Sequence, residues 1–295
     1  MLNWTQMLTK FCLFLFALLS LTAHSAELQL REVESPAQTN ATVNQPNQLP
    51  QSRITYSKGN IKSAWLVDPT DRYRHGVLGD ALEAGGLVVE KRDGGRLHMA
   101  LPANRVFEDL QPRLVDLDGD GQSEIIVVES DRALGASLAV YGLVDGKLAK
   151  RAATPFIGLA NRWLNPLGAG DFDGDGRLDI ALVETPHIGG ILRLYHFDTP
   201  NLKLFAEYYG VSTHRIGSTE LGLGRVVSAR PRDLMLVPDQ SRKVLMLLEF
   251  RNDEFNVLAK KRLPASLGSS LNAIESGLWR FRLIDGRNFV IQLVR

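Results

Sequence analysis

Cysteine is nearly absent from this chain of 295 residues. The single copy, Cys12, lies within the first 26 residues. Those residues contain an apolar run at 11–21, preceded by Lys10 and followed by small residues, which is the pattern of a cleavable export signal. The run is shorter than the roughly 20 apolar residues of a membrane span, and an uncleaved anchor is the alternative. We expect residues 1–26 to be removed, leaving a periplasmic or secreted protein with no transmembrane segment. Without a thiol, it has no disulfide, thiolate metal site or cysteine nucleophile.

An excess of charge of either sign is also absent. The chain has 34 basic and 33 acidic side chains, and loss of Lys10 with the signal would leave 33 of each. A neutral chain is a poor match for a nucleic acid partner, so we expect none. The sequence contains neither the Gly-x-Ser-x-Gly nor the His-Glu-x-x-His signature, and we assign no catalytic residue.

Two acidic stretches, 116–124 and 171–179, are nearly identical, with carboxylates at positions one, three, five and nine and glycines at four and six. Such carboxylates repel by about 4 kcal/mol per pair at a separation near 4 Å and an effective dielectric near 20. We therefore expect each loop to hold a cation, and an all-oxygen donor set favours Ca²⁺. Position twelve, where a helical calcium loop needs Glu, is Val127 or Leu182. The candidate ligands, with the backbone carbonyl at position seven, are Asp116, Asp118, Asp120, Gln122 and Glu124, and Asp171, Asp173, Asp175, Arg177 and Asp179.

The rest of the chain lacks a convincing long helix and reads as short β-strands separated by turn residues. Position nine recurs at Glu124, Asp179 and Asp233, a period of about 55 residues, which is typical of four-stranded propeller blades. We expect an all-β propeller at 53–295, with a β-sandwich as the alternative that leaves the period unexplained. The five predicted units span 61–101, 111–153, 164–209, 223–262 and 271–294.

The last unit supplies only three strands. A short strand from Arg53 to Ser57 has no partners in its own unit, so we expect it to close the ring on the outside of the last blade. Residues 27–52 are polar and interrupted by proline, and we expect them to form a disordered linker.

The pattern Asp-x-Asp-Gly-Asp-Gly-x-x-Asp, followed by a β run and repeated at blade spacing, resembles the FG-GAP/VCBS repeats. These are the calcium-binding propeller repeats of integrin α-subunit heads and of many exported bacterial proteins. The segment Gly168-Ala-Gly-Asp171 matches the glycine approach to the loop in that family. Unit one retains only Asp68 and Asp71, and unit four has arginine and proline before Asp233. The resemblance therefore implies Ca²⁺ in units two and three only.

Cages of this kind are complete, so we expect the Ca²⁺ ions to be structural. The leading hypothesis is a non-catalytic module that binds a protein or carbohydrate ligand on a propeller face. The alternatives are a propeller enzyme of glycosidase or lyase type, with carboxylates in the central channel, and a structural module of a cell-envelope assembly. His187 is the best histidine candidate for ligand contact, and Trp163 is a possible sugar-stacking platform.

Overall fold

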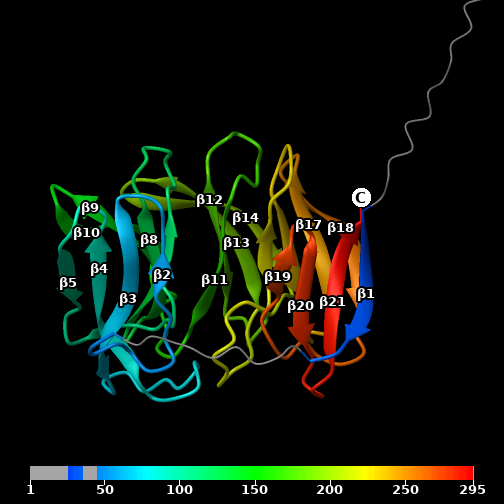
Figure 1. The fold of residues 1–295 in the computed structure, drawn as a ribbon, viewed down its shortest axis with the longest axis horizontal. Helices are drawn as coiled ribbons and strands as arrows, with labels where there is room; N and C mark the ends of the chain where they lie inside the picture. The colour runs from blue at the N-terminus through cyan, green and yellow to red at the C-terminus, as the bar shows by residue number, and fades with distance from the viewer. Residues whose placement is uncertain (1–25, 36–44, 295) are drawn as a thin grey trace, which may run out of the picture.

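The computed structural model describes residues 26–35 and 45–294, which form 21 strands and no helix (Figure 1). The prediction of an all-β fold is therefore confirmed. The expected export signal at 1–26 lies outside the described residues, apart from Ala26.

The strands pair into five antiparallel blades of four strands, the number predicted. Blade one contains β2 (Thr55–Tyr56), β3 (Ile61–Thr70), β4 (Glu83–Lys91) and β5 (Arg96–Ala100); blade two contains β7 (Arg113–Val115), β8 (Glu124–Asp131), β9 (Gly135–Val144) and β10 (Lys147–Ala153); blade three contains β11 (Leu164–Gly170), β12 (Asp179–Glu184), β13 (Ile191–Asp198) and β14 (Asn201–Tyr209); blade four contains β15 (Arg225–Val227), β16 (Leu234–Pro238), β17 (Val244–Arg251) and β18 (Glu254–Arg262); blade five contains β19 (Asn272–Glu275), β20 (Leu278–Arg282), β21 (Asn288–Val294) and β1 (Glu27–Val33).

The short strand β6 (Arg105–Phe107) lies between blades one and two and pairs with both β4 and β8. A single parallel pair, Ala153 with Asn201, joins blade two to blade three. These links connect the first three blades into one continuous sheet, whereas blades four and five are separate sheets.

The strand that completes blade five is not the one expected. β1 pairs with β21 along its whole length, from Glu27 opposite Val294 to Val33 opposite Asn288. The predicted closing strand, Arg53 to Ser57, instead contributes β2, which pairs with β3 as the first strand of blade one. The principle of closure by an N-terminal strand was right, but the choice of residues was wrong.

The predicted linker at 27–52 is also wrong where the structure describes it. Leu28 of β1 is buried, because its side chain packs into the core shared by blades four and five. Leu49 is buried against blade one, and its amide donates to the carbonyl of Leu66. Residues 36–44 lie outside the described residues. The propeller therefore begins at Glu27. Most side chains of β1 face solvent, which explains why its sequence looked unstructured.

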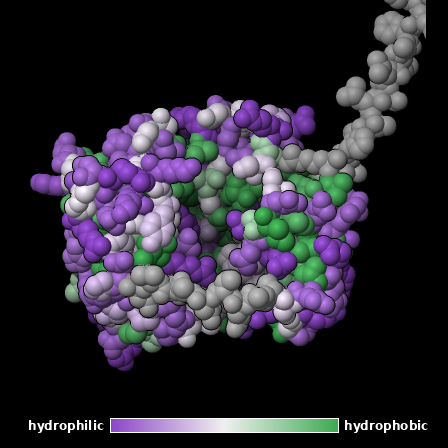
Figure 2. All heavy atoms as spheres, viewed as in Figure 1, coloured by the Kyte–Doolittle hydropathy of each residue, from purple (hydrophilic) through white to green (hydrophobic). Residues whose placement is uncertain are grey.

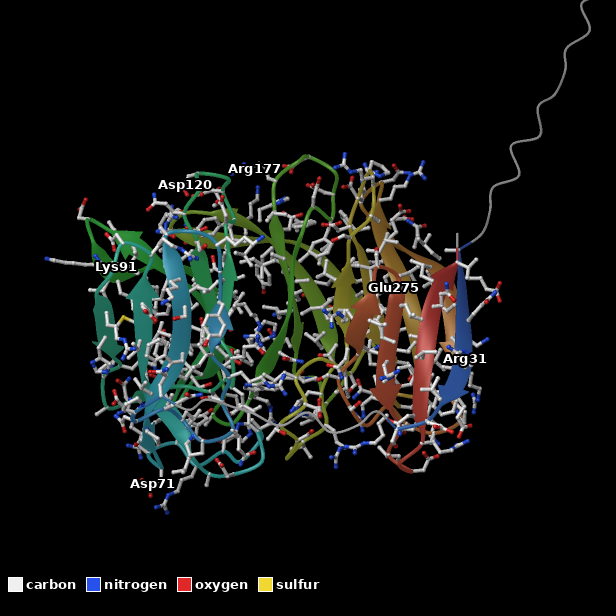
Figure 3. All side chains as sticks on the ribbon, viewed as in Figure 1. Arg31, Asp71, Lys91, Asp120, Arg177 and Glu275 are labelled. Carbon is white, nitrogen blue, oxygen red and sulfur yellow. The ribbon has the colours of Figure 1, made fainter. Side chains whose placement is uncertain are left out.

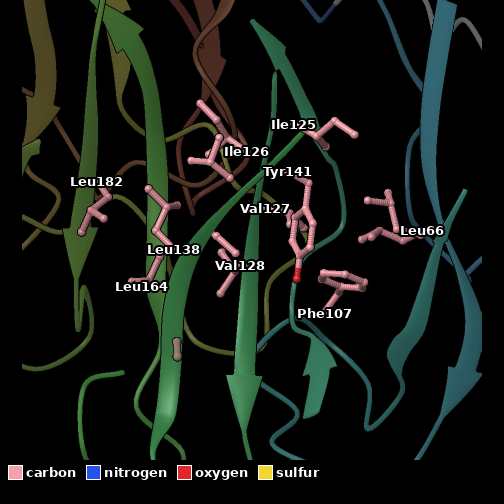
Figure 4. Packing of buried hydrophobic residues seen from close by; sticks show 14 of the residues in the cluster. Leu66, Phe107, Ile125, Ile126, Val127, Val128, Leu138, Tyr141, Leu164 and Leu182 are labelled. Atoms are coloured by element: carbon pink, nitrogen blue, oxygen red, sulfur yellow. The ribbon is translucent and has the colours of Figure 1, made fainter. Parts of the chain in front are cut away.

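The core consists of strands buried on both faces. All eight residues of β8 are buried, and the central strands of blades three and four are nearly as enclosed. Figure 4 shows this packing around Tyr141, whose ring meets Phe107 edge to face with centroids 5.8 Å apart. Burial on both faces accounts for the continuous apolar runs in the sequence.

The strands run between two ends of the propeller. One end, here called the acidic-loop end, has the connections β7–β8 and β11–β12; Figure 3 shows Asp120 and Arg177 there. Asp71 lies at the opposite end, in the 71–82 connection of blade one. That long connection lies within the predicted unit 61–101, where short strands separated by turn residues were expected. Figure 2 shows the visible side hollowed between blade one and blade five.

Candidate metal sites and central channel

Each acidic loop is wrapped around its first carboxylate. Asp116 accepts hydrogen bonds from the amides of Gly119 and Gly121, at 2.9 and 3.0 Å. Asp171 accepts the equivalent pair from Gly174 and Gly176, at 2.8 and 3.1 Å. All four glycines have φ between 75° and 86°, a backbone conformation that residues with a Cβ rarely adopt. Glycine at positions four and six therefore allows the loop to curl.

In the second loop, the carboxylates of Asp171, Asp173 and Asp175 converge, each offering an oxygen within 4.8 Å of the others. Oxygens bound to one Ca²⁺ at 2.3–2.6 Å can be no farther apart than about 5 Å, so this spacing fits a single ion. In the first loop the converging groups are Asp116, Asp118 and Glu124.

Asp120 does not join the first group, because its carboxylate accepts hydrogen bonds from the backbone and side chain of Gln122. The position-seven residues Gln122 and Arg177 each donate their amide to the carboxylate at position five, at 2.7 and 2.8 Å. Both position-seven side chains are exposed, so we do not count them as side-chain ligands. Their backbone carbonyls stay predicted ligands.

The ninth carboxylate is buried beneath each loop. One oxygen of Glu124 accepts from the amide of Leu117 at 2.9 Å, and one oxygen of Asp179 accepts from Phe172 at 3.3 Å. Burial raises the pKa of Glu124, and it raises the pKa of Asp179 to about 6. A buried carboxylate of this kind needs a cationic partner to stay ionised.

The two blades place different side chains beside this carboxylate. In blade two, Arg151 forms ion pairs with both Glu124 and Asp118. In blade three, His196 Nδ1 lies 2.8 Å from Asp179, and its ring stacks on Phe205 with centroids 4.0 Å apart. Neither His196 nor Arg151 is part of the repeated acidic pattern, and only the strand register, which pairs His196 with Asp179, brings His196 to the loop.

The two side chains proposed for ligand contact belong to one aromatic cluster at the opposite end. Trp163 is buried and its indole donates to the carbonyl of Glu108 at 2.9 Å, so it cannot present a face to a sugar. His187 stacks on Trp163, and its Nε2 lies 2.8 Å from Nδ1 of the buried His214. This cluster seals the interior between blades.

The innermost strands of the five blades surround a central cavity of about 310 Å³. Its lining includes Arg53, Arg113 and Arg225, and the described residues that line it include no carboxylate. The enzyme alternative requires paired carboxylates at this place, and arginines occupy it instead. Sequence reasoning missed these arginines because they are far apart along the chain, although each lies at or just before the start of an innermost strand.

Among the described residues, no helix combines the length and apolar character needed to cross a membrane.

Comparison with known proteins gives one family match. The model of the FG-GAP-like repeat matches residues 116–182, which contain both acidic loops. The structure of BamB from Moraxella catarrhalis is similar to the chain, with a TM-score of 0.42 and 13% identity, over 86% of this chain and 62% of that one. The exotype rhamnogalacturonan lyase YesX is similar with a TM-score of 0.40 and 13% identity, over 80% of this chain and 56% of that one. The chain thus spans less than two thirds of either protein, and no curated protein matches it by sequence.

Proposed function

Because residues 116–182 form an FG-GAP-like repeat within a five-bladed, all-β propeller, we propose that this protein is an exported, calcium-stabilised module that binds a protein partner. The binding surface is the end of the propeller opposite the acidic loops. It acts without catalysis, and calcium serves the fold.

The observation that carries this proposal is a set of exposed aliphatic side chains at the opposite end. All are leucine or isoleucine in connections between strands, and their exposed fractions run from 38% to 64%. The set, here called the aliphatic rim, is Leu82, Leu134, Leu159, Ile188, Ile216 and Ile284. The other exposed aliphatic residues of the described chain lie within strands and not in connections: Val144, Leu204, Val257, Ile274 and Val294. Apolar side chains gathered at one end of a soluble domain favour a docking surface.

A protein fits the aliphatic rim better than a carbohydrate does. Sugar rings pack against flat aromatic faces, whereas the rim consists of six branched aliphatic side chains, with Tyr209 at the end of β14 as the strongly exposed aromatic residue at that end among the described residues. Neighbouring members also lie close together: the amide of Gly158, next to Leu159, donates to the carbonyl of Leu134 at 2.8 Å. Branched side chains of this kind pack into the apolar core of a protein interface.

Site-specific photo-cross-linking in intact cells tests the surface. A photoreactive residue at position 188, 216 or 284 should give one common adduct that protease digests. The matched positions are 144 at the acidic-loop end and 257 on the outer strand of blade four, both of which are exposed and apolar in the native chain. Adducts from those two positions at equal yield, or none from the rim, would remove the rim as the docking surface.

Calcium is the second part of the proposal. The converging oxygens of Asp171, Asp173 and Asp175 support it, together with the matching group in the first loop. A bound ion would hold the β11–β12 connection closed and offset the repulsion among the carboxylates. Ions that bind only the folded state raise its stability by mass action.

The test for calcium compares Asp173→Asn with Asp253→Asn, which neutralises a carboxylate in the exposed β17–β18 turn. In 1 mM calcium we expect Asp173→Asn to lower the Tm by several degrees and Asp253→Asn to leave it within about one degree. In chelator, Asp173→Asn should match or exceed the wild type, because it relieves repulsion. A wild-type Tm that does not respond to chelation would sink the calcium proposal.

A further inference from the structure

Two cavities adjoin at the opposite end of the propeller. The central cavity of about 310 Å³ lies next to a larger one of about 620 Å³ beside blade five, and Asn272 contributes to the lining of both. The larger cavity includes Ile284, a member of the aliphatic rim, and Arg215, the neighbour of Ile216. A ligand docked on the rim at Ile284 therefore borders the larger cavity, and the central cavity lies beyond Asn272.

The charge of these cavities is strongly one-sided. Their described lining contains six arginines and a single carboxylate, Glu220, in a chain whose net charge is only +1. The arginines are Arg53, Arg113, Arg215, Arg225, Arg280 and Arg282. Blades one, two, four and five and the β14–β15 connection all contribute, so the accumulation arises from the fold and not from one basic segment.

Few of these charges are neutralised within the protein. Arg113 pairs with the buried Asp109 at 2.6 Å, and Arg225 donates to the carbonyl of Leu271. Glu220 is already occupied, since it accepts hydrogen bonds from the amide and hydroxyl of Ser270 at 2.9 and 2.6 Å.

The other four arginines form no ion pair among the described residues. The Nε atom of Arg280 is buried and, within the same part of the chain, has no hydrogen-bond partner. A buried donor on a cationic group is costly to leave unpaired, which favours an anionic ligand that reaches it. Guanidinium groups bind carboxylates through paired hydrogen bonds, so a carboxylate suits this wall of the cavity.

We propose that the adjoining arginine-lined cavities receive an acidic segment of the protein partner, whose glutamate or aspartate side chains bind Arg280 and Arg282. This inference rests on the proposed function and adds the chemistry of the partner. Flanking apolar residues of the same partner would pack on the aliphatic rim at Ile216 and Ile284. An acidic peptide is favoured over an acidic polysaccharide because the described lining of both cavities includes no aromatic side chain.

The test uses fluorescein-labelled hexaglutamate and the full chain after removal of residues 1–25, with anisotropy as the readout at low ionic strength. We expect saturable binding that weakens with salt, and no binding of hexalysine. The double variant Arg280→Gln/Arg282→Gln should weaken hexaglutamate binding about tenfold or more, because it removes charged hydrogen bonds. The matched control is Arg251→Gln/Arg262→Gln, which removes the same charge from exposed positions in blade four and should change affinity less than twofold.

Three results would overturn the inference: no hexaglutamate binding, equal loss in the two double variants, or hexagalacturonate binding more than tenfold tighter than hexaglutamate. Arg282→Gln alone, at an exposed position, provides the comparison if the double variant does not fold. The outcome is independent of the photo-cross-linking experiment. Adducts at positions 188, 216 and 284 without hexaglutamate binding would leave the docking surface standing and remove only its acidic partner.

Discussion

The ninth residue of each acidic loop is a buried carboxylate, and the side chain that contacts it differs between blades two and three. Glu124 is held by Arg151, which stands in a β-bulge of blade two. Asp179 is held by His196, while Phe205 takes the equivalent bulge position in blade three. At Gly142, which corresponds to His196, an added Cβ would come within 2.7 Å of the Arg151 side chain. Arginine in the bulge therefore requires glycine on the neighbouring strand.

The histidine pair at the opposite end has a defined protonation pattern. The carbonyl of Ser218 accepts from His214 Nε2 at 2.8 Å, so Nδ1 of His214 must accept from Nε2 of His187. Burial lowers the pKa of His214 to about 3 and that of His187 to about 4, and the nearby Arg242 acts in the same direction. Both rings are therefore neutral in the folded protein at neutral pH.

This pattern predicts a loss of stability in mild acid. The pKa of His187 is 6.5 in the unfolded chain and about 4 in the folded protein. Between these pH values, His187 is protonated in the unfolded chain and neutral in the folded protein. The free energy of unfolding contributed by this residue is fully present above pH 6.5 and falls by about 1.4 kcal/mol per pH unit below it. Replacing His187→Phe keeps the stacking on Trp163 and should reduce the measured slope by up to that amount between pH 6 and pH 4.

The measurement is urea unfolding of wild type and variant across this pH range, with chelator in both so that calcium does not enter. Identical slopes for the two proteins would contradict the assignment of a neutral, half-buried His187.

At the scale of the element, the blade is the unit that repeats. The outermost strand has a β-bulge in blades two, three and four, where the extra residues are Arg151, Phe205 and Leu258. A bulge in the same place increases the local twist of each blade in the same way. β1 differs from every other outer strand in its chain order. The other outer strands directly follow the strand with which they pair, whereas β1 begins the propeller and pairs with β21.

The role of β1 predicts a contrast between adjacent residues. Leu28 is buried in the core of blades four and five, whereas Gln29 faces solvent. We expect Leu28→Ala to lower the free energy of unfolding by about 2–4 kcal/mol, and Gln29→Ala to change it by less than about 0.5 kcal/mol. Chemical denaturation of the two variants measures the difference. Equal, small effects would mean that β1 is not part of the cooperative fold.

The sequence was informative where a pattern repeats. The acidic loops fixed the register of blades two and three, so the third predicted unit begins at residue 164, where β11 begins. Blade one lacks that pattern, and nothing in the predicted unit 61–101 marked its long 71–82 connection. β1 could not be found because its partner is at the other end of the chain, and only pairing with β21 gives its alternating residues a buried side. The arginine-lined cavities were hidden for the same reason.

At the scale of the whole molecule, the two ends of the propeller have different chemistry. The acidic-loop end collects carboxylates in tight turns, and the opposite end combines the aliphatic rim with arginine-lined cavities. Separation of this kind would let the proposed calcium ions stabilise the fold without competing for the surface proposed to bind a partner. It also places the acidic loops away from the arginines, which would otherwise attract them.

The pairing of β1 with β21 sets the order of events when the chain is made. Residues 27–33 are made before the rest of the propeller and cannot pair until residues 288–294 are available. Until then blade five lacks its outer strand, and the apolar side chain of Leu28 has nowhere to pack. Closing so long a loop is slow, because its entropy must be lost before the new contacts form. The last strand to be made is thus the one that lets the first strand fold.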